Sequence, residues 1–369
     1  MSTLIVVHER SHVASDRRKA GCDTVDAVTA ARCEVLVVGA GPIGIELAVA
    51  LKRAAISYAH VDAGQIGSTI SWYAPQTHFF SSPERIAIAG VPLQTLDQSK
   101  ATREEYLAYV RAVVLQFDLA IETYERVTSI VRRDDGAFAV TTHGRRGGRE
   151  RIANKVVLAI GDMHRPRLLG VPGEDLPHVS HYFADPHTYF RRRVLIVGGR
   201  NSAVEAAIRC VRVGAEVTLS YRRAELDADH IKFWLYPELR GLIRDERITF
   251  LPATSIREIR SDAVILGPAE QRIEADAVLL LTGYEQDSTL FDEAGITLDG
   301  PHRRPRFDER TMETNVPGIY VAGTAVAGTQ ASGVKAFIET SHIHVERIMA
   351  ALTGTSAPSA RPAYEMPET

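Results

Sequence analysis

The sequence contains few cysteines, and only Cys22, Cys33 and Cys210 occur among its 369 residues. None of the three forms a C-x-x-C pair or a cluster with the spacing of metal ligands. This usage argues against a disulfide scaffold and a metal site, and it favours a reducing compartment. We therefore expect a cytoplasmic protein that holds no metal.

Long apolar runs are also missing. No run approaches the roughly 18 residues of a membrane-spanning helix. Residues 4–7 are too few for the apolar core of a signal peptide, which has about 7 to 15 residues. The formal net charge of -3 leaves no excess of basic residues for a polyanionic partner. We therefore expect neither a membrane nor nucleic acid among the partners.

Length and composition are those of a globular protein with two domains. Hydrophobic residues make up 45% of the chain and charged residues 24%. Single cores stop growing at roughly 250 to 300 residues, so a chain of this length is expected to divide. Residues 1–32 mix both signs of charge without clear periodicity. A loosely ordered N-terminal extension is expected there.

The strongest local signal lies in residues 33–51, CEVLVVGAGPIGIELAVAL. A run rich in β-branched residues stops at three glycines spaced as G-x-G-x-x-G, and a helical pattern follows. This order predicts a strand, a tight turn that a pyrophosphate can approach, and a helix whose first N–H groups face the phosphates. An acid about twenty residues later is expected to hold a ribose hydroxyl. The predicted dinucleotide-binding residues are Gly39, Gly41, Pro42, Gly44 and Asp62, and a purely structural glycine turn is the alternative.

Residues 64–83, GQIGSTISWYAPQTHFFSSP, predict a long loop rich in aromatic residues. Loops of this length inside compact domains are often functional. Two interpretations remain open for the aromatic side chains, which either line a site for a flat cofactor or pack in the core. The side chains concerned are Trp72, Tyr73, His78, Phe79 and Phe80.

Two local patterns predict core elements next to this loop. Thr102 and Glu105 form a capping box, and apolar residues recur at helical spacing over residues 106–117. Asp135 and Gly136 lie between two short β patterns and predict a hairpin turn.

A second strand, glycine turn and helix begins about 160 residues after the first. Residues 194–197 lead into GGRNSA and an alanine-rich helix. Arg200 stands where the second glycine is usual and Ala203 where the third is usual, so the motif fits less closely. The predicted nucleotide-binding residues here are Gly198, Gly199, Asn201, Ser202 and Ala203, and a structural turn is again the alternative.

The strand that follows, residues 216–220, ends in Tyr221, Arg222 and Arg223 and not in an acid. An acid would favour a free 2′-hydroxyl, whereas a guanidinium can hold a 2′-phosphate through two hydrogen bonds. We therefore predict that Arg222 and Arg223 bind NADPH in preference to NADH. A solvated pair of arginines is the alternative.

Three further strands are predicted to end in glycine. Residues 155–161, KVVLAIG, and residues 277–283, AVLLLTG, are similar patterns that end at Gly161 and Gly283. Residues 316–324, VPGIYVAGT, predict a short strand and then a helix that runs to about Leu352. This last segment is expected to return the chain to the first domain.

These patterns predict an α/β protein with two Rossmann-like nucleotide-binding domains, three-layer ββα/αβα units, the second inserted into the first. The predicted boundaries are 1–32 for the extension, 33–183 and 287–355 for the two parts of the first domain, 184–286 for the second domain, and 356–369 for a disordered tail.

Together, the motifs VVGAGPIG, LAIG, VGGRNSAVEAA, LLTG and VPGIYVAG resemble the two-domain flavoprotein reductases of the low-molecular-weight thioredoxin reductase type over about residues 33–352. Within that group, APQTHFFSSPERIAIAGVP and VSHYFADPHTYF are similar to the bacillithiol-disulfide reductases. The resemblance implies FAD on the first domain, NADPH on the inserted domain, and hydride transfer from nicotinamide to flavin. It also implies a homodimer or higher homo-oligomer, and rotation of the domains about linkers near residues 179–186 and 284–288. Further cofactor contacts implied are Gly161, Gly283, Gly323 and Thr324.

The chain departs from this family pattern at its thiols. Where thioredoxin reductases carry C-x-x-C, it has residues 179–183, VSHYF. Where the bacillithiol-type relatives carry a cysteine in the first glycine turn, it has Ile43. Cys33 lies at the far end of its strand, at about 3.3 Å per residue well away from the turn. Cys210 is an expected core residue, and Thr324 replaces an acid that relatives place after Ala-Gly.

We therefore predict an FAD-dependent NADPH oxidoreductase that passes electrons to a small-molecule or small redox-protein acceptor. His181 and Tyr182 are candidate catalytic residues beside the flavin, because they replace the dithiol, and a structural role is the alternative. Two other functions remain open: a reductase of ferredoxin, flavodoxin or quinone, and a redox sensor that binds nucleotides without turnover. A flavin monooxygenase is disfavoured because the F-x-G-x-x-x-H pattern is absent.

Overall fold

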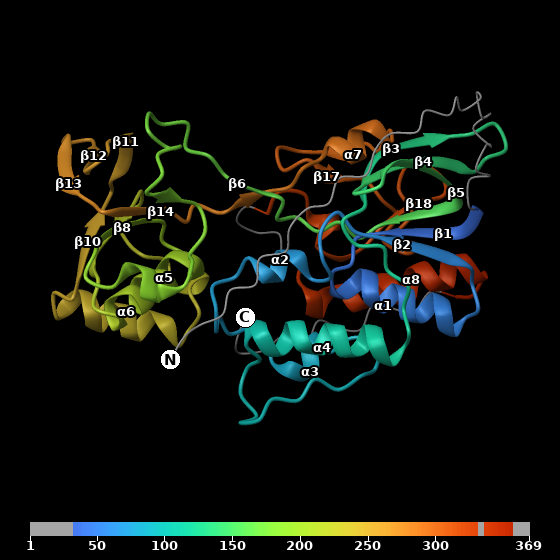
Figure 1. Ribbon diagram of the computed structural model, residues 1–369, viewed down its shortest axis with the longest axis horizontal. Helices are drawn as coiled ribbons and strands as arrows, with labels where there is room; N and C mark the ends of the chain where they lie inside the picture. Colours follow the sequence, from blue (N-terminus) through green and yellow to red (C-terminus); the bar gives the residue numbers. More distant parts are fainter. Residues whose placement is uncertain (1–31, 331–335, 357–369) are drawn as a thin grey trace, which may run out of the picture. The chain divides into compact units, whose positions relative to one another are not determined.

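The computed structural model describes residues 32–330 and 336–356 of the chain. These residues form two large sheets with helices packed against them (Figure 1). The strands of the second sheet lie in sequence between strands of the first, which confirms the predicted α/β class and the inserted domain. The predictions for Cys22, for the N-terminal extension and for the C-terminal tail concern residues outside the described ranges.

The first sheet has the strand order β2-β1-β5-β4-β3, and β18 also pairs with β5. Its strands are β1 (Arg32–Val38), β2 (Tyr58–Val61), β3 (Arg126–Arg132), β4 (Phe138–Gly144), β5 (Gly147–Leu158) and β18 (Ile319–Val321). Strands β2, β1, β5 and β18 pair in parallel, whereas β3 and β4 form the antiparallel hairpin predicted around Asp135 and Gly136. Because β18 comes from the end of the chain, the predicted return to the first sheet is confirmed.

Helices of the first unit cover its parallel strands. They are α1 (Pro42–Arg53), α2 (Ser68–Ser71), α3 (Pro83–Ile86), α4 (Arg103–Gln116), α7 (Thr289–Glu293) and α8 (Ile338–Thr353). Helices α1 and α8 pack together on one side of the sheet, and α7 packs against β3 (Figure 1). The capping box of Thr102 and Glu105 begins α4 as predicted. The short helix α2 interrupts the stretch that was predicted to be a continuous loop.

The second sheet contains parallel strands only. In spatial order they are β10 (Ile248–Pro252), β9 (Glu216–Tyr221), β8 (Arg193–Val197), β14 (Ala277–Leu280) and β7 (Val179–Ser180). Helices α5 (Asn201–Arg212) and α6 (Leu235–Arg244) lie on one side of it (Figure 1). A small antiparallel sheet lies on the other side, formed by β11 (Ser255–Ile259), β12 (Ala263–Gly267) and β13 (Gln271–Glu274). This arrangement is the predicted three-layer unit.

Two short strands connect the sheets. Strand β6 (Arg165–Pro166) pairs antiparallel with β15 (Tyr284–Glu285), so the outgoing and returning segments run side by side. Strand β7, which precedes the predicted domain boundary at residues 183 and 184, already pairs with β14 of the second sheet.

The remaining elements are short. An antiparallel pair is formed by β16 (Leu298–Asp299) and β17 (Arg304–Pro305). The 3-10 turns are η1 (Pro186–Tyr189), η2 (Ala228–His230) and η3 (Gly323–Ala327).

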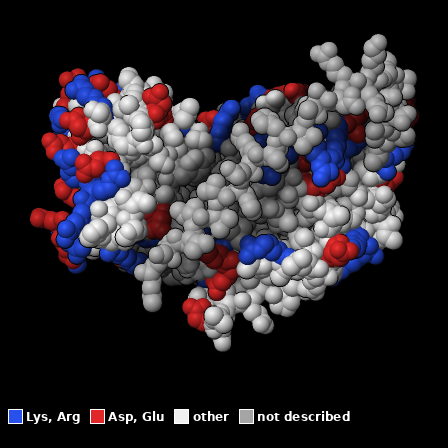
Figure 2. All heavy atoms as spheres, viewed as in Figure 1, with Lys and Arg blue, Asp and Glu red and all other residues white. Residues whose placement is uncertain are grey.

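Two further features concern the surface charge and the character of the helices. Basic and acidic side chains are interspersed over the face shown in Figure 2. None of the helices in the described ranges combines the length and apolar character needed to cross a bilayer.

Candidate active site

The three glycines of the first turn differ in the space around them. A Cβ atom at Gly39, where φ is +108°, would overlap the carbonyl oxygen of Ala159, and one at Gly44 would overlap the carbonyl oxygen of Gly39. Both positions therefore need glycine for the close packing of strand and helix. A Cβ atom at Gly41 would meet nothing within 4 Å. The open side of Gly41 faces the beginning of α1, where helix N–H groups favour a phosphate, and this geometry fits a pyrophosphate.

Two side chains after β2 attach to this turn. The carboxylate of Asp62 accepts hydrogen bonds from the backbone N–H groups of Ala40 and Gly64. His60 donates from Nε2 to the carbonyl oxygen of Gly39 at 2.9 Å, and burial lowers the pKa of His60 to about 4. Pro42, predicted as a cofactor contact, is the first residue of α1. Asp62 thus lies at the turn, as the motif predicts, and its carboxylate also orients the backbone.

A polar cluster that sequence reasoning missed lies where β5 and β18 end. The Asp162 carboxylate accepts a hydrogen bond from Nε2 of Gln330 at 2.8 Å, and the Thr324 hydroxyl lies beside it. Burial raises the pKa of Asp162. A Cβ atom at Gly161 would lie 3.7 Å from Oγ1 of Thr324, so the two predicted cofactor contacts Gly161 and Thr324 are neighbours. Asp162 therefore supplies a carboxylate next to the position where family members carry an acid at 324.

Gln286 completes the cluster from the returning connection. Its Nε2 donates to the carbonyl oxygens of Gly161 at 2.8 Å and Ala325 at 3.1 Å. Its Oε1 is buried and has no hydrogen-bond partner within the described part of the chain. A buried acceptor without a partner is costly, so it is available to an N–H group of a bound cofactor. Asp162 and Gln286 had one weak sequence signal, their position shortly after the glycine-ended patterns at Gly161 and Gly283.

The glycines that follow β18 and β14 differ in their surroundings. Gly323 packs beside Ile43, since its Cβ atom would lie 3.4 Å from Cβ of that residue. A Cβ atom at Gly283 would meet nothing within 4 Å. Ile43 is only 5% exposed, so the position where relatives carry a glycine-turn cysteine is filled by packing.

The five aromatic residues of the predicted loop do not form one wall. Phe79 packs on Tyr106 in the core, with ring centroids 4.5 Å apart. Phe80 stacks on Trp234 with centroids 5.8 Å apart, and the His78 side chain is exposed. Only Trp72 and Tyr73 line a cavity, of about 460 Å³.

This aromatic cavity contains one of the two candidate catalytic residues. Its lining residues are Ser71, Trp72, Tyr73, Pro75, Arg103, Tyr182, Phe183 and Ala184. Trp72 and Tyr182 meet edge to face at 5.8 Å, and Tyr182 lies 5.8 Å from Tyr284. Burial, with Asp162 nearby, raises the pKa of Tyr73 to about 12. Tyr73 therefore lies within electrostatic range of the polar cluster.

The other candidate, His181, turns away from this cavity. Its Nε2 lies 3.6 Å from Oε1 of Glu174, and its Nδ1 is buried without a partner among the described residues. The carboxylate of Glu174 also accepts the backbone N–H groups of Leu169 and Gly170. The structure thus separates His181 from Tyr182, although the two are adjacent in sequence.

In the second module, glycines again serve packing. A Cβ atom at Gly198 would lie 2.6 Å from the Leu281 carbonyl oxygen and 2.9 Å from Cβ of Ala203. Ala203 is buried, which is why the third motif position must stay small. Asn201 accepts the backbone N–H of Lys232 at 2.6 Å, while Ser202 is exposed at the beginning of α5.

Three arginines follow two neighbouring strands of this module. Arg200 follows β8 and Arg222 and Arg223 follow β9, and these parallel strands are paired side by side. All three side chains are exposed. Nη1 of Arg223 lies 3.5 Å from Asp227, whereas Arg222 has no ion pair within the described residues. Arg200, which sequence reasoning treated only as a missing glycine, therefore adds a third cation at this edge.

The described cysteines lie away from both glycine turns. Sγ of Cys33 is 3.8 Å from the Ile152 carbonyl oxygen, at the opposite end of β1 from Gly39. Cys210 lies on α5 and is fully buried in the core of the second module, and burial raises the pKa of its thiol to about 12.

Comparisons with known proteins agree with this geometry. A sequence profile described as pyridine nucleotide-disulphide oxidoreductase matches residues 36–323. Bacilliredoxin reductase Bdr of Bacillus subtilis (strain 168) is 33% identical over 323 residues, covering 86% of this chain and 97% of that protein. A solved structure of bacillithiol disulfide reductase Bdr from Bacillus cereus has 34% identity and a TM-score of 0.82, with 88% and 99% of the two chains covered. A ferredoxin–NADP reductase of Thermus thermophilus is 27% identical over 303 residues, covering 79% of this chain and 84% of that protein. The resemblance inferred from the motifs is confirmed.

Proposed function

The chain belongs to the pyridine nucleotide-disulphide oxidoreductase family, and from this premise we propose that it reduces a small acceptor directly at FAD, without a protein thiol. FAD and NADPH are the cofactors that this membership implies. When bound, FAD takes a hydride from NADPH and passes the two electrons on. The net reaction consumes NADPH, a proton and the oxidised acceptor, and yields NADP⁺ and the reduced acceptor.

The observation that carries the proposal is the position of the thiols. A thiol-exchange enzyme needs a thiolate within reach of both the flavin and the substrate. Cys33 lies at the far end of β1, Cys210 lies in a core, and Ile43 occupies the glycine turn. These positions support a route by which the electrons leave the flavin without passing through Cys33 or Cys210.

The residues of the site divide the remaining work. We assign the pyrophosphate of FAD to the open side of Gly41, and the flavin end to the cluster of Asp162, Thr324 and Gln286. We assign the 2′-phosphate of NADPH to the edge formed by Arg222 and Arg223. Electrostatic attraction between guanidinium groups and a phosphate supports this last assignment.

The aromatic cavity is the proposed entry for the acceptor. Its rings Trp72, Tyr73 and Tyr182 suit a flat molecule, because aromatic faces and edges pack against planar rings. This observation favours a quinone as the second candidate acceptor. A small disulfide is the first candidate, since relatives of 33% and 34% identity are named for bacilliredoxin and bacillithiol disulfide.

The test is anaerobic reduction of the alkylated holoenzyme with NADPH, followed through the flavin absorbance. Bacillithiol disulfide, thioredoxin, ferredoxin and a quinone are then added one at a time, and we expect one of them to reoxidise the flavin. Reduction by NADPH without reoxidation by any acceptor, while unalkylated enzyme is reoxidised, would show that a thiol is needed. An enzyme that oxidises no NADPH with any acceptor would instead be a sensor.

A pair of variants tests whether the aromatic cavity binds the acceptor. Trp72→Ala should raise the KM for the acceptor and leave flavin reduction by NADPH unchanged. Tyr124→Ala is the matched control, because Tyr124 is an exposed aromatic residue that does not line the cavity. Equal acceptor KM values in both variants would remove the cavity from the proposal.

A further inference from the structure

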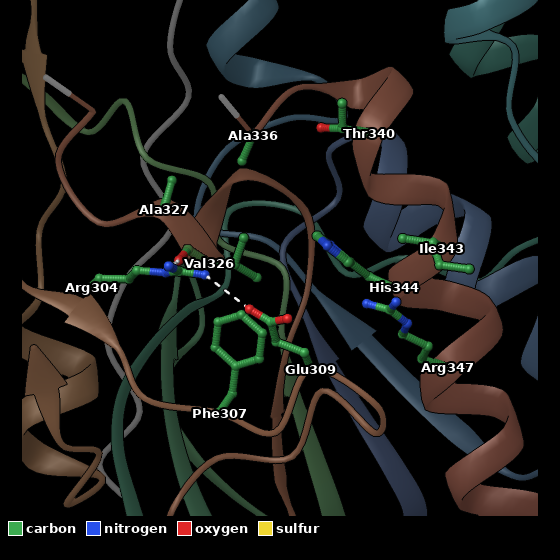
Figure 3. Close-up of a pocket in the computed structure, with 10 residues that line it drawn as sticks. All are labelled: Arg304, Phe307, Glu309, Val326, Ala327, Ala336, Thr340, Ile343, His344 and Arg347. Atoms are coloured by element: carbon green, nitrogen blue, oxygen red, sulfur yellow. Dashed lines mark hydrogen bonds and ion pairs between the residues drawn. The ribbon is translucent and has the colours of Figure 1, made fainter. Parts of the chain in front are cut away.

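A separate cavity of about 400 Å³ lies against α8, and none of the predicted cofactor residues lines it (Figure 3). It is bounded by α8, by η3 and by the segment that follows β17. Its lining residues are Arg304, Phe307, Glu309, Val326, Ala327, Ala336, Thr340, Ile343, His344 and Arg347. The volume lies within the range of roughly 300 to 1,000 Å³ that small-molecule sites occupy.

One face of α8 supplies the polar wall. Thr340, His344 and Arg347 recur three or four residues apart, so they lie along the same side of the helix. Figure 3 shows their side chains directed toward the space opposite Val326. The cavity is therefore a product of helix periodicity and of the turn η3 that faces it.

The lining of the cavity carries more positive than negative charge. Arg304 and Arg347 contribute two guanidinium groups against the single carboxylate of Glu309. Nη2 of Arg304 lies 3.9 Å from that carboxylate, whose side chain is 76% exposed at the rim. Arg347 is partly buried and forms no ion pair within the residues that the structure describes. A partly buried guanidinium without an acidic partner favours an anion.

His344 adds a second donor with a defined direction. Its Nδ1 accepts the backbone N–H of Gly323 at 3.2 Å. Because a backbone N–H can only donate, the neutral ring carries its proton on Nε2. The ring is 8% exposed, and burial lowers the pKa of His344 to about 4, so the neutral form prevails at neutral pH. No hydrogen bond to Nε2 occurs within the described ranges, so this N–H is available to an acceptor.

The opposite wall is apolar. Val326 and Ala327 of η3 and Ala336 are buried, the ring of Phe307 completes this wall, and Ile343 adds an apolar side chain from α8. The guanidinium of Arg304 lies over the Phe307 ring, 5.5 Å from its centroid. A ligand that fills the cavity must therefore combine an acceptor group for the cations with an apolar body.

We propose that this cavity binds a small organic carboxylate with a flat apolar body. The carboxylate accepts hydrogen bonds from Arg347 and from Nε2 of His344, and the body lies against Phe307 and Ile343. A carboxylate matches the planar fork of an arginine, which explains why this anion suits the site. The site is distinct from the proposed FAD and NADPH sites. Two hydrogen bonds connect it to the polar cluster around Asp162 and Thr324, from the Gly323 N–H to His344 and from Nε2 of Gln330 to the carbonyl oxygen of Ala336.

The test is calorimetric titration of the holoenzyme with benzoate. Benzamide serves as a neutral probe of the same shape, and inorganic phosphate as an anion without an apolar body. We expect benzoate to bind, and benzamide and phosphate to bind at least roughly tenfold more weakly. Benzamide lacks the negative charge, and phosphate lacks the apolar body. No heat from benzoate, or equal affinity for benzamide or phosphate, would overturn the proposal.

Variants locate the site on the protein. Arg347→Gln should weaken benzoate roughly tenfold or more, because it removes a charge-assisted contact, and Arg304→Gln should weaken it less. Arg306→Gln is the matched control, since Arg306 pairs with Asp299 and does not line the cavity. Both lining arginines are partly exposed, so these changes should leave folding intact, which circular dichroism checks. Unchanged benzoate affinity in Arg347→Gln, or an equal loss in Arg306→Gln, would contradict this location.

Discussion

The ring of Tyr221 lies directly against Gly199, so closely that a Cβ atom on residue 199 would be 2.5 Å from Cδ2 and 2.6 Å from Cζ of the ring. Tyr221 ends β9 and is only 8% exposed, whereas Gly199 follows β8. Their contact joins the ends of two neighbouring parallel strands. Gly199, predicted as a nucleotide-binding residue, therefore has a packing role of its own.

Gly199→Ala should lower the free energy of unfolding by about 1 to 3 kcal/mol, the usual cost of overpacking. Chemical denaturation measures this loss. In a Tyr221→Leu background the same alanine should cost much less, because the ring is gone. A Gly199→Ala protein as stable as wild type would show that the ring moves aside freely.

Gly41→Val should abolish FAD binding without unfolding the protein. The new side chain occupies the open space proposed for the pyrophosphate, and φ at Gly41 is -75°, which valine tolerates. The bound flavin is measured by absorbance of the purified protein. Gly241→Val is the control, because Gly241 on α6 also has nothing within 4 Å. Stoichiometric FAD in Gly41→Val would contradict the assignment.

The double change Arg222→Ala and Arg223→Ala should reduce kcat/KM for NADPH and leave that for NADH unchanged. Charge-assisted hydrogen bonds to the 2′-phosphate are worth about 1.5 to 3 kcal/mol, or roughly 10- to 150-fold. Arg244→Ala is a control, since Arg244 is exposed and pairs only with Asp245. A wild-type enzyme that prefers NADH would show that these arginines are ordinary solvated residues.

A variant without cysteines should keep its activity. Cys22→Ser and Cys33→Ser are combined with Cys210→Ala, because the fully buried Cys210 position would leave a serine hydroxyl in an apolar core. We expect NADPH oxidation with the physiological acceptor at near the wild-type rate. If the flavin of this variant is reduced but not reoxidised, one of the three thiols takes part.

Stability should fall between pH 6.5 and pH 4. Burial lowers the pKa values of His60 and His344 to about 4 in the folded protein, against about 6.5 when unfolded. Within this window the unfolded chain binds more protons, so the free energy of unfolding decreases as the pH falls. Each histidine contributes up to about 1.4 kcal/mol per pH unit.

His344→Asn should therefore reduce this slope, measured by denaturant unfolding at several pH values. Asparagine can still accept the Gly323 N–H, so the local structure should persist. His187→Asn is the control for a histidine replacement at an exposed position. Identical slopes in wild type and His344→Asn would show that another group causes the pH dependence.

Features that depend on neighbours in sequence could be predicted. The capping box of Thr102 and Glu105 and the hairpin at Asp135 and Gly136 arise from hydrogen bonds and backbone angles within a few residues. The glycine turn at Gly39 is equally local, because its positive φ and the following helix are encoded in one motif. The family resemblance extended these local signals to the cofactors.

Features that depend on which side a residue faces could not be predicted. His181 and Tyr182 are adjacent, yet one contacts Glu174 and the other lines the aromatic cavity. Both residues lie in the bend that follows β7, outside any regular element, so no periodicity in the sequence says which way each side chain points. For the same reason the residues from Trp72 to Phe80 separated, with Phe79 in the core, Phe80 stacked on Trp234, Trp72 and Tyr73 at the cavity, and His78 exposed.

The sequence alone determined that two nucleotide-binding units exist, one inserted in the other, and where their glycine turns lie, because those signals are contiguous. Only the tertiary structure brought Asp162, Gln286 and Gln330 together, since they are far apart in sequence and meet where β5 and β18 pair. It also decided that Gly41 opens onto free space while Gly39 and Gly44 pack. The residue type is glycine in both roles, and the difference lies in which backbone atoms surround the residue after folding.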